Sequence, residues 1–202
     1  MSDLLNIEMK NTEVIDTILL NIGKMFIRRG YVDKEYKIPT DISKEIQLNK
    51  MANFKLGTRK VSINILNQDV KNISSNSPID EYLSKNIDNH KFLIVKNFAK
   101  KPYKQINSDY KNAEIFLFHE LLEDIPAKQY IPNHTLVVNE DRDEILKTFA
   151  LKEFGKIYST DTMARYYGAK INDIFRIERP NINSGISIYY RIVIQGNLDI
   201  FI

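Results

Sequence analysis

Hydrophobic residues recur with two different periods along this 202-residue chain, and the period changes from segment to segment. Between Val14 and Arg29 they fall at spacings of one, three and four, which is typical of an amphipathic helix. Gly30 follows directly, and the two arginines before it suit the negative end of the helix dipole. The pattern therefore predicts a helix that ends at Gly30.

Shorter hydrophobic runs predict strands in the middle of the chain. Residues 61–67 alternate apolar and polar side chains, which is typical of a half-buried strand. Residues 91–98 and 114–120 are dense apolar runs that are too short for helices, so we interpret both as buried strands. A serine-rich loop precedes a short helix that begins near Ile79. Together these elements predict an α/β or α+β domain.

Two polar segments show neither period. Residues 32–60 contain Pro39, alternating charges and few apolar residues, which favours a loop and a short helix rather than a strand. Residues 99–112 are expected to form a loop between the two buried strands. This loop is the most basic surface candidate of the sequence. With Lys96, which precedes it, the loop forms a basic patch of Lys96, Lys100, Lys101, Lys104 and Lys111, interleaved with Tyr103 and Tyr110.

The last third of the chain predicts a second domain. Pro126 and Pro132 break any regular element, so we place a boundary there, with domains at residues 1–128 and 129–202. Residues 139–152 predict a helix capped by Asn139, and a brief second helix is expected from Asp161, its cap, to Gly168.

Residues 173–180 and 186–194 then alternate around a turn, which predicts a β-hairpin. The fold class is α+β: an N-terminal α/β domain is followed by a small mixed α/β domain with a C-terminal β-hairpin.

Composition and charge narrow the function. A formal charge of +3 is small for a dedicated nucleic-acid binder, so any contact with DNA must be local. The chain has no cysteine, which excludes disulfides, thiolate metal sites and a cysteine nucleophile. No apolar run approaches the ~20 residues that a bilayer span requires. An intracellular protein with no membrane contact is expected.

Catalytic motifs are scarce, and we expect no metal and no cofactor. The three histidines lack the spacing of metal ligands; His119 is expected in a strand, and His90 and His134 in loops. Glu35 and Lys37 match the short D/E-x-K pattern of Mg²⁺ nucleases, so a metal-dependent nuclease-like DNA-processing protein is the alternative.

Two groups of residues are candidates for binding, each with a structural alternative. The lysines of the basic patch can neutralise phosphates, or they can belong to a solvated loop. A second concentration of tyrosine and arginine is typical of protein interfaces, although the tyrosines can equally pack half inside. Its members are Arg165, Tyr166, Tyr167, Tyr189, Tyr190 and Arg191.

The stretch from Ser159 to Ile194 resembles the C-terminal assembly domain of the fifth, shared subunit of eukaryotic-type DNA-dependent RNA polymerases, and is similar to the small archaeal polymerase subunit of the same family. Thr162 and Asn172 depart from the family pattern, which has proline and glycine there. Upstream, Pro132, His134, Leu146 and Leu151 carry a weaker likeness. The matching residues are Asp161, Ala164, Arg165, Tyr166, Gly168, Lys170, Ile177, Arg179, Ser184, Gly185, Tyr190 and Arg191.

The resemblance implies a non-catalytic polymerase subunit in a hetero-oligomer. Residues 1–128 would form a jaw beside downstream duplex DNA, and residues 129–202 an assembly domain docked on the largest polymerase subunit and near other subunits. The nucleus, or the cytoplasmic factory and virion of a large DNA virus, is the expected location. The implied DNA-proximal residues are Lys100, Lys101, Pro102, Tyr103 and Lys104. The implied interface residues are Asp161, Arg165, Tyr166, Gly168, Lys170, Arg179, Gly185, Tyr190 and Arg191.

Overall fold

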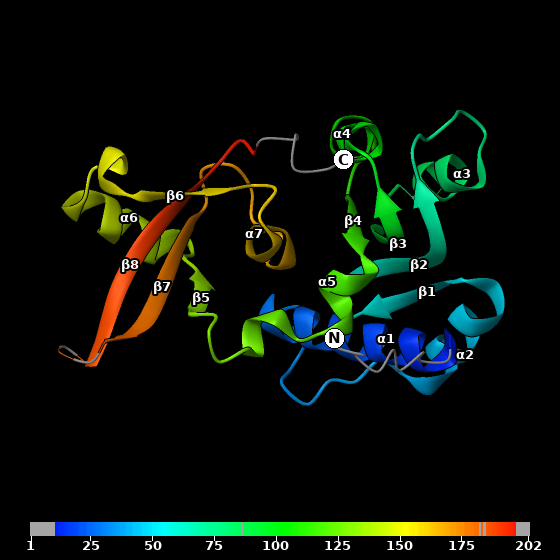
Figure 1. The fold of residues 1–202 in the computed structure, drawn as a ribbon, viewed down its shortest axis with the longest axis horizontal. Coiled ribbons are helices and arrows are strands. Elements are labelled where there is room, and N and C mark those ends of the chain that lie inside the picture. The colour runs from blue at the N-terminus through cyan, green and yellow to red at the C-terminus, as the bar shows by residue number, and fades with distance from the viewer. Residues whose placement is uncertain (1–10, 86, 182, 184, 197–202) are drawn as a thin grey trace, which may run out of the picture. The chain divides into compact units, whose positions relative to one another are not determined.

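The structure is a computed structural model that describes residues 11–85, 87–181, 183 and 185–196. The chain divides into two compact units between Glu123 and Asp124, close to the boundary expected between residues 128 and 129. Both units mix helices with strands (Figure 1), which confirms the predicted α+β class. In the described part of the chain, no helix is long and apolar enough to cross a lipid bilayer.

The first unit is built on a four-stranded sheet with the strand order β1-β2-β3-β4. Strands β2, β3 and β4 run parallel, and β1 pairs with β2 in an antiparallel hairpin. The elements are α1 (Asn11–Arg28), α2 (Thr40–Asn49), β1 (Met51–Leu56), β2 (Arg59–Val70), α3 (Pro78–Ser84), β3 (His90–Phe98), α4 (Lys100–Asp109), β4 (Ala113–Leu117) and α5 (Phe118–Leu122).

Helix α1 is the amphipathic helix predicted from the sequence. Its apolar stripe is fully buried, with Ile18, Ile22 and Phe26 at 0% exposure. Gly30 has φ +67°, and the amide of Tyr31 donates to the carbonyl of Phe26 at 2.9 Å. A left-handed glycine directly after a helix is the usual C-terminal cap. The predicted end of the helix is therefore confirmed.

Two predictions for the first sheet are wrong. Residues 61–65 are buried on both faces, Ser62 and Asn64 included, because β2 lies between β1 and β3 in a sheet covered on both sides. A half-buried strand was expected there. The segment 32–60 was expected to contain no strand, yet it contains β1, whose inward side chains are only Ala52 and Leu56.

The run 114–120 is only partly a strand. Strand β4 ends at Leu117, and α5 begins at Phe118. The carboxylate of Glu120 accepts a hydrogen bond from the amide of Leu117 at 2.8 Å, which satisfies a donor at the helix start. His119 therefore lies in a helix, contrary to prediction.

The second unit has a sheet with the order β5-β7-β8-β6. The predicted hairpin is confirmed: β7 and β8 are antiparallel and lie side by side (Figure 1). The elements are η1, a 3₁₀ turn (Ile125–Ala127), β5 (Asn133–Leu136), α6 (Asn139–Thr148), η2, a second 3₁₀ turn (Leu151–Glu153), β6 (Gly155–Tyr158), α7 (Thr162–Tyr166), β7 (Ile174–Asn181) and β8 (Gly185–Ile194).

Alternate residues of β7 and β8 enter two small cores on opposite faces of the sheet. Phe175 and Val193 pack with Ala164 of α7 on one face. Ile174 and Ile192 form a cluster on the other face, against which residues of α6 pack. Helix α6 begins at residue 139 with Val138 in the capping position, so the predicted cap at Asn139 is one residue too late.

Candidate functional site

The basic segment after β3 is a helix, not the predicted loop. Lys100, Lys101 and Lys104 are exposed in the first part of α4, which has no acidic residue in its first turn. Three positive charges near the positive end of a helix dipole repel one another and are repelled by that end of the helix. A nearby anion reduces both repulsions. The start of α4 therefore favours a negatively charged neighbour.

Pro102 and Tyr103 differ from the lysines because both are buried. The ring of Tyr103 stacks on Phe98 with a centroid distance of 5.7 Å, which holds α4 against the end of β3. Proline is tolerated there because the first amides of a helix have no partner within the helix. These two residues position the lysines rather than expose groups of their own.

Lys111 and Tyr110 are not part of the same surface. Both follow α4, whose ten residues separate them from its start by about 15 Å. The hydroxyl of Tyr110 donates to the Asp80 carboxylate at 2.6 Å. Partial burial and this carboxylate raise the pKa of Tyr110 to about 12. Tyr110 therefore has a structural role, and the predicted patch shrinks to its N-terminal members.

The residues expected at a subunit interface separate into buried and accessible groups. Arg165 and Tyr166 of α7 are buried within the second unit at 8% and 3% exposure. Four of the other expected residues are exposed: Asp161, Lys170, Arg179 and Gly185. Three are partly exposed: Gly168, Tyr190 and Arg191. Ser184, which belongs to the family resemblance, lies outside the described residues. Any contact with a partner therefore falls mainly to the exposed group, while Arg165 and Tyr166 support the fold.

The backbone at the start of α7 and in the turn after it accommodates the two departures from the family pattern. The Asp161 carboxylate caps α7 by accepting from the amide of Met163 at 2.8 Å, so Thr162 opens the helix without a proline. Asn172 has φ +74° where the family has glycine. Asparagine is one of the few residues besides glycine that adopt this conformation readily. Both substitutions preserve the local backbone.

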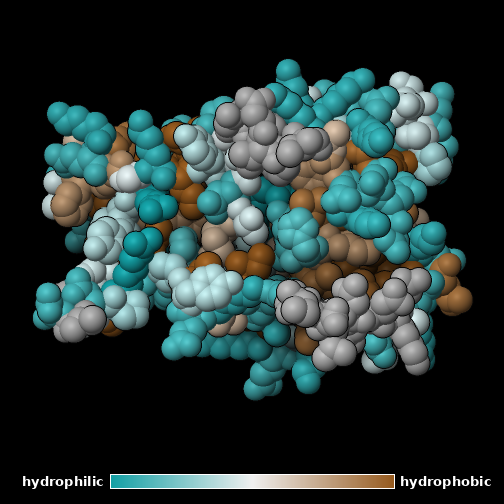
Figure 2. Space-filling view, viewed as in Figure 1, coloured by the Kyte–Doolittle hydropathy of each residue, from teal (hydrophilic) through white to brown (hydrophobic). Residues whose placement is uncertain are grey.

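The apolar part of the hairpin surface was not predicted from the sequence. Three residues of β8 are exposed: Ile186 at 65%, Ile188 at 48% and Tyr189 at 50%. On the visible face of the second unit, on the left of the view, hydrophobic side chains lie between hydrophilic ones (Figure 2). The guanidinium of Arg179 lies 5.7 Å from the ring centre of Tyr189. The hairpin thus presents a mixed apolar and basic surface.

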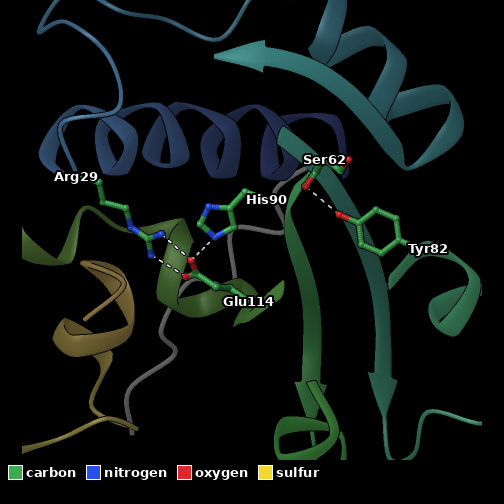
Figure 3. Close-up of polar contacts among 5 residues, drawn as sticks. All are labelled: Arg29, Ser62, Tyr82, His90 and Glu114. Atoms are coloured by element: carbon green, nitrogen blue, oxygen red, sulfur yellow. Dashed lines mark hydrogen bonds and ion pairs between the residues drawn. The ribbon is translucent and has the colours of Figure 1, made fainter. Parts of the chain in front are cut away.

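A buried charge cluster in the first unit was also missed. Arg29, directly after α1, donates to both carboxylate oxygens of Glu114 on β4, each at 2.8 Å (Figure 3). His90 Nε2 lies 2.6 Å from Glu114 Oε1. The side chain of Arg29 is 1% exposed and that of Glu114 is 23% exposed. The sequence suggested only a helix-dipole role for Arg29.

The electrostatics of this cluster are strongly coupled. Burial raises the pKa of the Glu114 carboxyl, but the Arg29 charge and the contacts with Arg29 and His90 outweigh burial and bring that pKa to about 2. Burial lowers the pKa of Arg29, whereas Glu114 raises it, and the net direction is upward. Both groups are therefore charged at neutral pH, and the cluster ties the end of α1 to β4.

Two buried polar side chains tie α3 to the same sheet. The hydroxyl of Tyr82 lies within hydrogen-bonding distance of the carbonyls of Ser62, at 2.9 Å (Figure 3), and Phe92, at 3.1 Å. The ammonium group of Lys91 donates to the carbonyl of Leu83 near the end of α3 at 2.6 Å. Burial lowers the pKa of Lys91. Both side chains are buried, so these contacts stabilise the fold.

Two of the three histidines have structural roles. His90 begins β3 and pairs with Glu114, and His134 lies buried in β5, so the predicted loop positions are wrong. Nδ1 of His134 donates to the carbonyl of Pro132 at 2.7 Å. Burial lowers the pKa of His134, so this ring is neutral at pH 7.

The nuclease alternative gains no support from the described residues. Glu35 and Lys37 are exposed in the connection between α1 and α2. In the part of the chain that the structure describes, no three His, Asp or Glu side chains gather where they could hold a metal ion. A Mg²⁺ nuclease needs such convergent carboxylates.

Comparison with known proteins assigns the second unit and then the whole chain. The model of the family "RNA polymerase Rpb5, C-terminal domain" matches residues 123–193. The chain is also 39% identical over 67 residues to DNA-directed RNA polymerase subunit Rpo5 of Methanocaldococcus jannaschii, an alignment that covers 86% of that protein and 32% of this chain. The chain belongs to the subunit 5 family of DNA-directed RNA polymerases.

The subunit 5 relatives include a viral one that aligns along both units. DNA-directed RNA polymerase subunit 5 of Acanthamoeba polyphaga mimivirus is 27% identical over 205 residues, which covers 95% of this chain and 97% of that protein. The subunit rpabc1 of RNA polymerases I, II and III from Dictyostelium discoideum is 33% identical over 100 residues, 48% of this chain and 51% of that one. The expected family membership is confirmed.

Proposed function

We propose that this chain is a non-catalytic subunit of a multisubunit DNA-directed RNA polymerase, docked on the largest subunit through its second unit. The observation that carries this proposal is the alignment with mimivirus subunit 5, which spans both units rather than the C-terminal domain alone. The described residues hold no metal-binding group, and their ionisable clusters serve the fold. An intracellular location, in the nucleus or in a viral factory, follows from the same proposal.

We further propose that the first unit is a jaw beside downstream duplex DNA. The exposed lysines at the start of α4 support this placement, because they offer a local positive charge on a chain whose net charge is only +3. Contacts with phosphates fix position without reading sequence, as a polymerase that transcribes any template requires.

Docking is tested by purifying the tagged full-length chain from its native source. We expect the two largest polymerase subunits to be recovered in equal molar amounts with the chain. Changing Arg179 and Arg191 to glutamate should abolish that recovery, because both side chains lie on the hairpin surface. The double change Lys34→Glu and Lys37→Glu inverts the same charge in the first unit and should leave recovery intact. If the tagged wild-type chain recovered no polymerase subunits, the proposed function would be refuted.

The DNA contact is tested in the assembled polymerase. Replacing Lys100, Lys101 and Lys104 by alanine should weaken binding to downstream duplex DNA and reduce the slope of log K against log[salt] by about 2.7, since each neutralised phosphate contributes about 0.9. The binding constant is measured between about 50 and 200 mM salt, the range in which counterion release dominates.

A matched variant removes three exposed lysines elsewhere in the same unit: Lys34, Lys37 and Lys44. Its salt slope should equal that of the wild type. Equal slopes for all three polymerases would show that α4 does not meet the phosphate backbone, whereas equal losses in both variants would indicate a diffuse field rather than a local contact.

A further inference from the structure

One edge of the second sheet is left partly open. Strand β6 covers β8 only over Arg191–Ile194, where it pairs with Gly155–Tyr158. The preceding part of β8, Gly185–Tyr190, pairs with β7 on its other side. Within the described residues, no strand pairs with this half of β8 on the side of β6.

The backbone groups of Ile186 and Ile188 point to the open edge. The carbonyl of Ile194 accepts from Ser159, which follows β6, and the carbonyl of Val193 accepts from Asn172, which precedes β7. Neighbouring residues of a strand direct their N–H and C=O groups to opposite sides. Because the pairing of β7 with β8 runs without a shift, residues 194, 192, 190, 188 and 186 all face the side of β6.

The two sides of the hairpin are protected differently. On the outer side of β7, the part beyond β5 contains Pro180, which lacks an N–H and discourages pairing with another chain. The open half of β8 contains neither proline nor lysine, and Ile186, Ile188 and Tyr189 are exposed on it. Exposed hydrophobic edge strands are normally protected by proline, by charged side chains or by a covering element. The open half of β8 has neither proline nor lysine, which favours pairing with a further strand.

A hollow of about 430 Å³ lies at the same place, beside Gly155, the residue at which β6 begins. Phe149, Phe154 and Ile188 supply apolar walls, and Arg179 and Arg191 supply positive charge against one acid, Glu153. No described carboxylate forms an ion pair with either arginine. The hollow therefore suits an extended segment with apolar side chains and a carboxylate.

We propose that an extended, acid-bearing segment of the largest polymerase subunit adds to β8 as a further strand, in line with β6, and bonds to the backbone of Ile186 and Ile188. This inference rests on the proposed docking function and deepens it. Strand addition derives affinity from main-chain hydrogen bonds and specificity from alternate side chains. Here those side chains would enter the hollow, with the carboxylate against Arg179 and Arg191.

Hydrogen exchange on the full-length chain tests the pairing directly. The amides of Ile186 and Ile188 should exchange rapidly in the free chain. In the complex with polymerase lacking this subunit, they should slow at least 100-fold, because a bonded amide in a strand exchanges only when the pairing opens. The amide of Gln129, an exposed residue of the second unit that is not among the predicted interface residues, should exchange at the same rate in the free chain and in the complex.

A proline variant tests the same edge by affinity. Ile188→Pro removes an outward donor, and an edge strand accepts proline there. We expect at least a tenfold loss of affinity for polymerase lacking this subunit. Ile188→Val keeps the donor and a similar side chain, so its affinity should stay within twofold of wild type. Circular dichroism reports whether the proline variant folds, and exchange on the wild type remains decisive if it does not.

The outcomes separate the two proposals. Binding with slowed exchange at Ile186 and Ile188 supports strand addition. Binding with unchanged exchange at both amides refutes strand addition and leaves the docking function standing. Failure of the wild-type chain to bind refutes the docking function itself. A free chain that dimerises with both amides protected would show that a second copy, and not another subunit, covers the edge.

Discussion

Replacing Glu114 by glutamine is expected to lower the free energy of unfolding of the first unit by about 3 to 5 kcal/mol at pH 7. The change removes the carboxylate that pairs with the guanidinium of Arg29, whose side chain is 1% exposed. A buried cation that loses a paired carboxylate retains its cost of dehydration and loses the attraction that offset it. Urea denaturation followed by far-ultraviolet circular dichroism measures the difference.

Glu81→Gln is the matched control, because it removes a carboxylate that also pairs with a cation. Glu81 and Lys85 lie 3.1 Å apart, but their side chains are 56% and 70% exposed. An exposed pair contributes about 0.5 kcal/mol or less. Equal losses for the two variants would show that burial of the Arg29 pair has no energetic consequence.

The effect of Glu114→Gln should also depend on pH in a defined direction. The pKa of Glu114 falls from its ordinary value of 4.5 to about 2 on folding, so the carboxylate stabilises the folded state fully above about pH 4.5. This contribution, about 3 kcal/mol, is lost as the pH falls towards 2. Wild type and variant should therefore converge in acid. A difference that stayed constant between pH 7 and pH 2 would contradict the assignment.

Gly196→Ala should destabilise the second unit by about 3 kcal/mol. A Cβ atom at this position would lie 2.4 Å from Thr160 Oγ1 and 2.8 Å from the backbone nitrogen of the same residue. The side chain of Thr160 is buried and the backbone nitrogen cannot rotate away, so the chain itself must shift. Tyrosine fluorescence during denaturation reports the change, since the chain has no tryptophan.

Gly23→Ala makes the same chemical change where space is available. The nearest atom to its new Cβ, Ile38 Cγ1, would be 3.8 Å away, an ordinary contact. Gly23 lies inside α1, where alanine is favoured over glycine by about 0.5 to 1 kcal/mol. The two glycine variants should thus shift stability in opposite directions. A loss at Gly23 or no change at Gly196 would contradict this account of the local packing.

Sequence patterns predicted the fold best where local chemistry decides the structure. The helix ending at Gly30, the cap at Asp161 and the hairpin of β7 and β8 each follow from neighbouring residues. Sequence patterns gave wrong predictions where contacts between distant segments determine which side chains are buried. Ser62 and Asn64 are polar, yet helices and neighbouring strands bury them, and no local feature distinguishes such a strand from a half-buried one.

The candidate surfaces were predicted by residue type more than by geometry. The lysines of α4 and Arg179 are exposed and Arg191 is partly exposed, whereas four other candidates are buried: Pro102, Tyr103, Arg165 and Tyr166. Arginine and tyrosine bury a long apolar stem or ring while a polar end finds a partner, so composition alone cannot assign them to a core or to an interface. The open edge of β8 depends on the residue at which β6 begins to pair with it, which only the structure shows.

The links between the two ends of the first unit bear on how the chain is made. The Asn21 side chain donates to the carbonyl of Leu121, 100 residues later, and Arg29 pairs with Glu114, 85 residues later. Helix α1 leaves the ribosome first, but the residues that secure it are synthesised last. Contacts of such long sequence separation must overcome the entropy of closing the intervening loop before they contribute stability. Helix α1 can contact α2 as soon as α2 has been made, but its contacts with β4 and α5 form only after Glu114 and Leu121 have been synthesised.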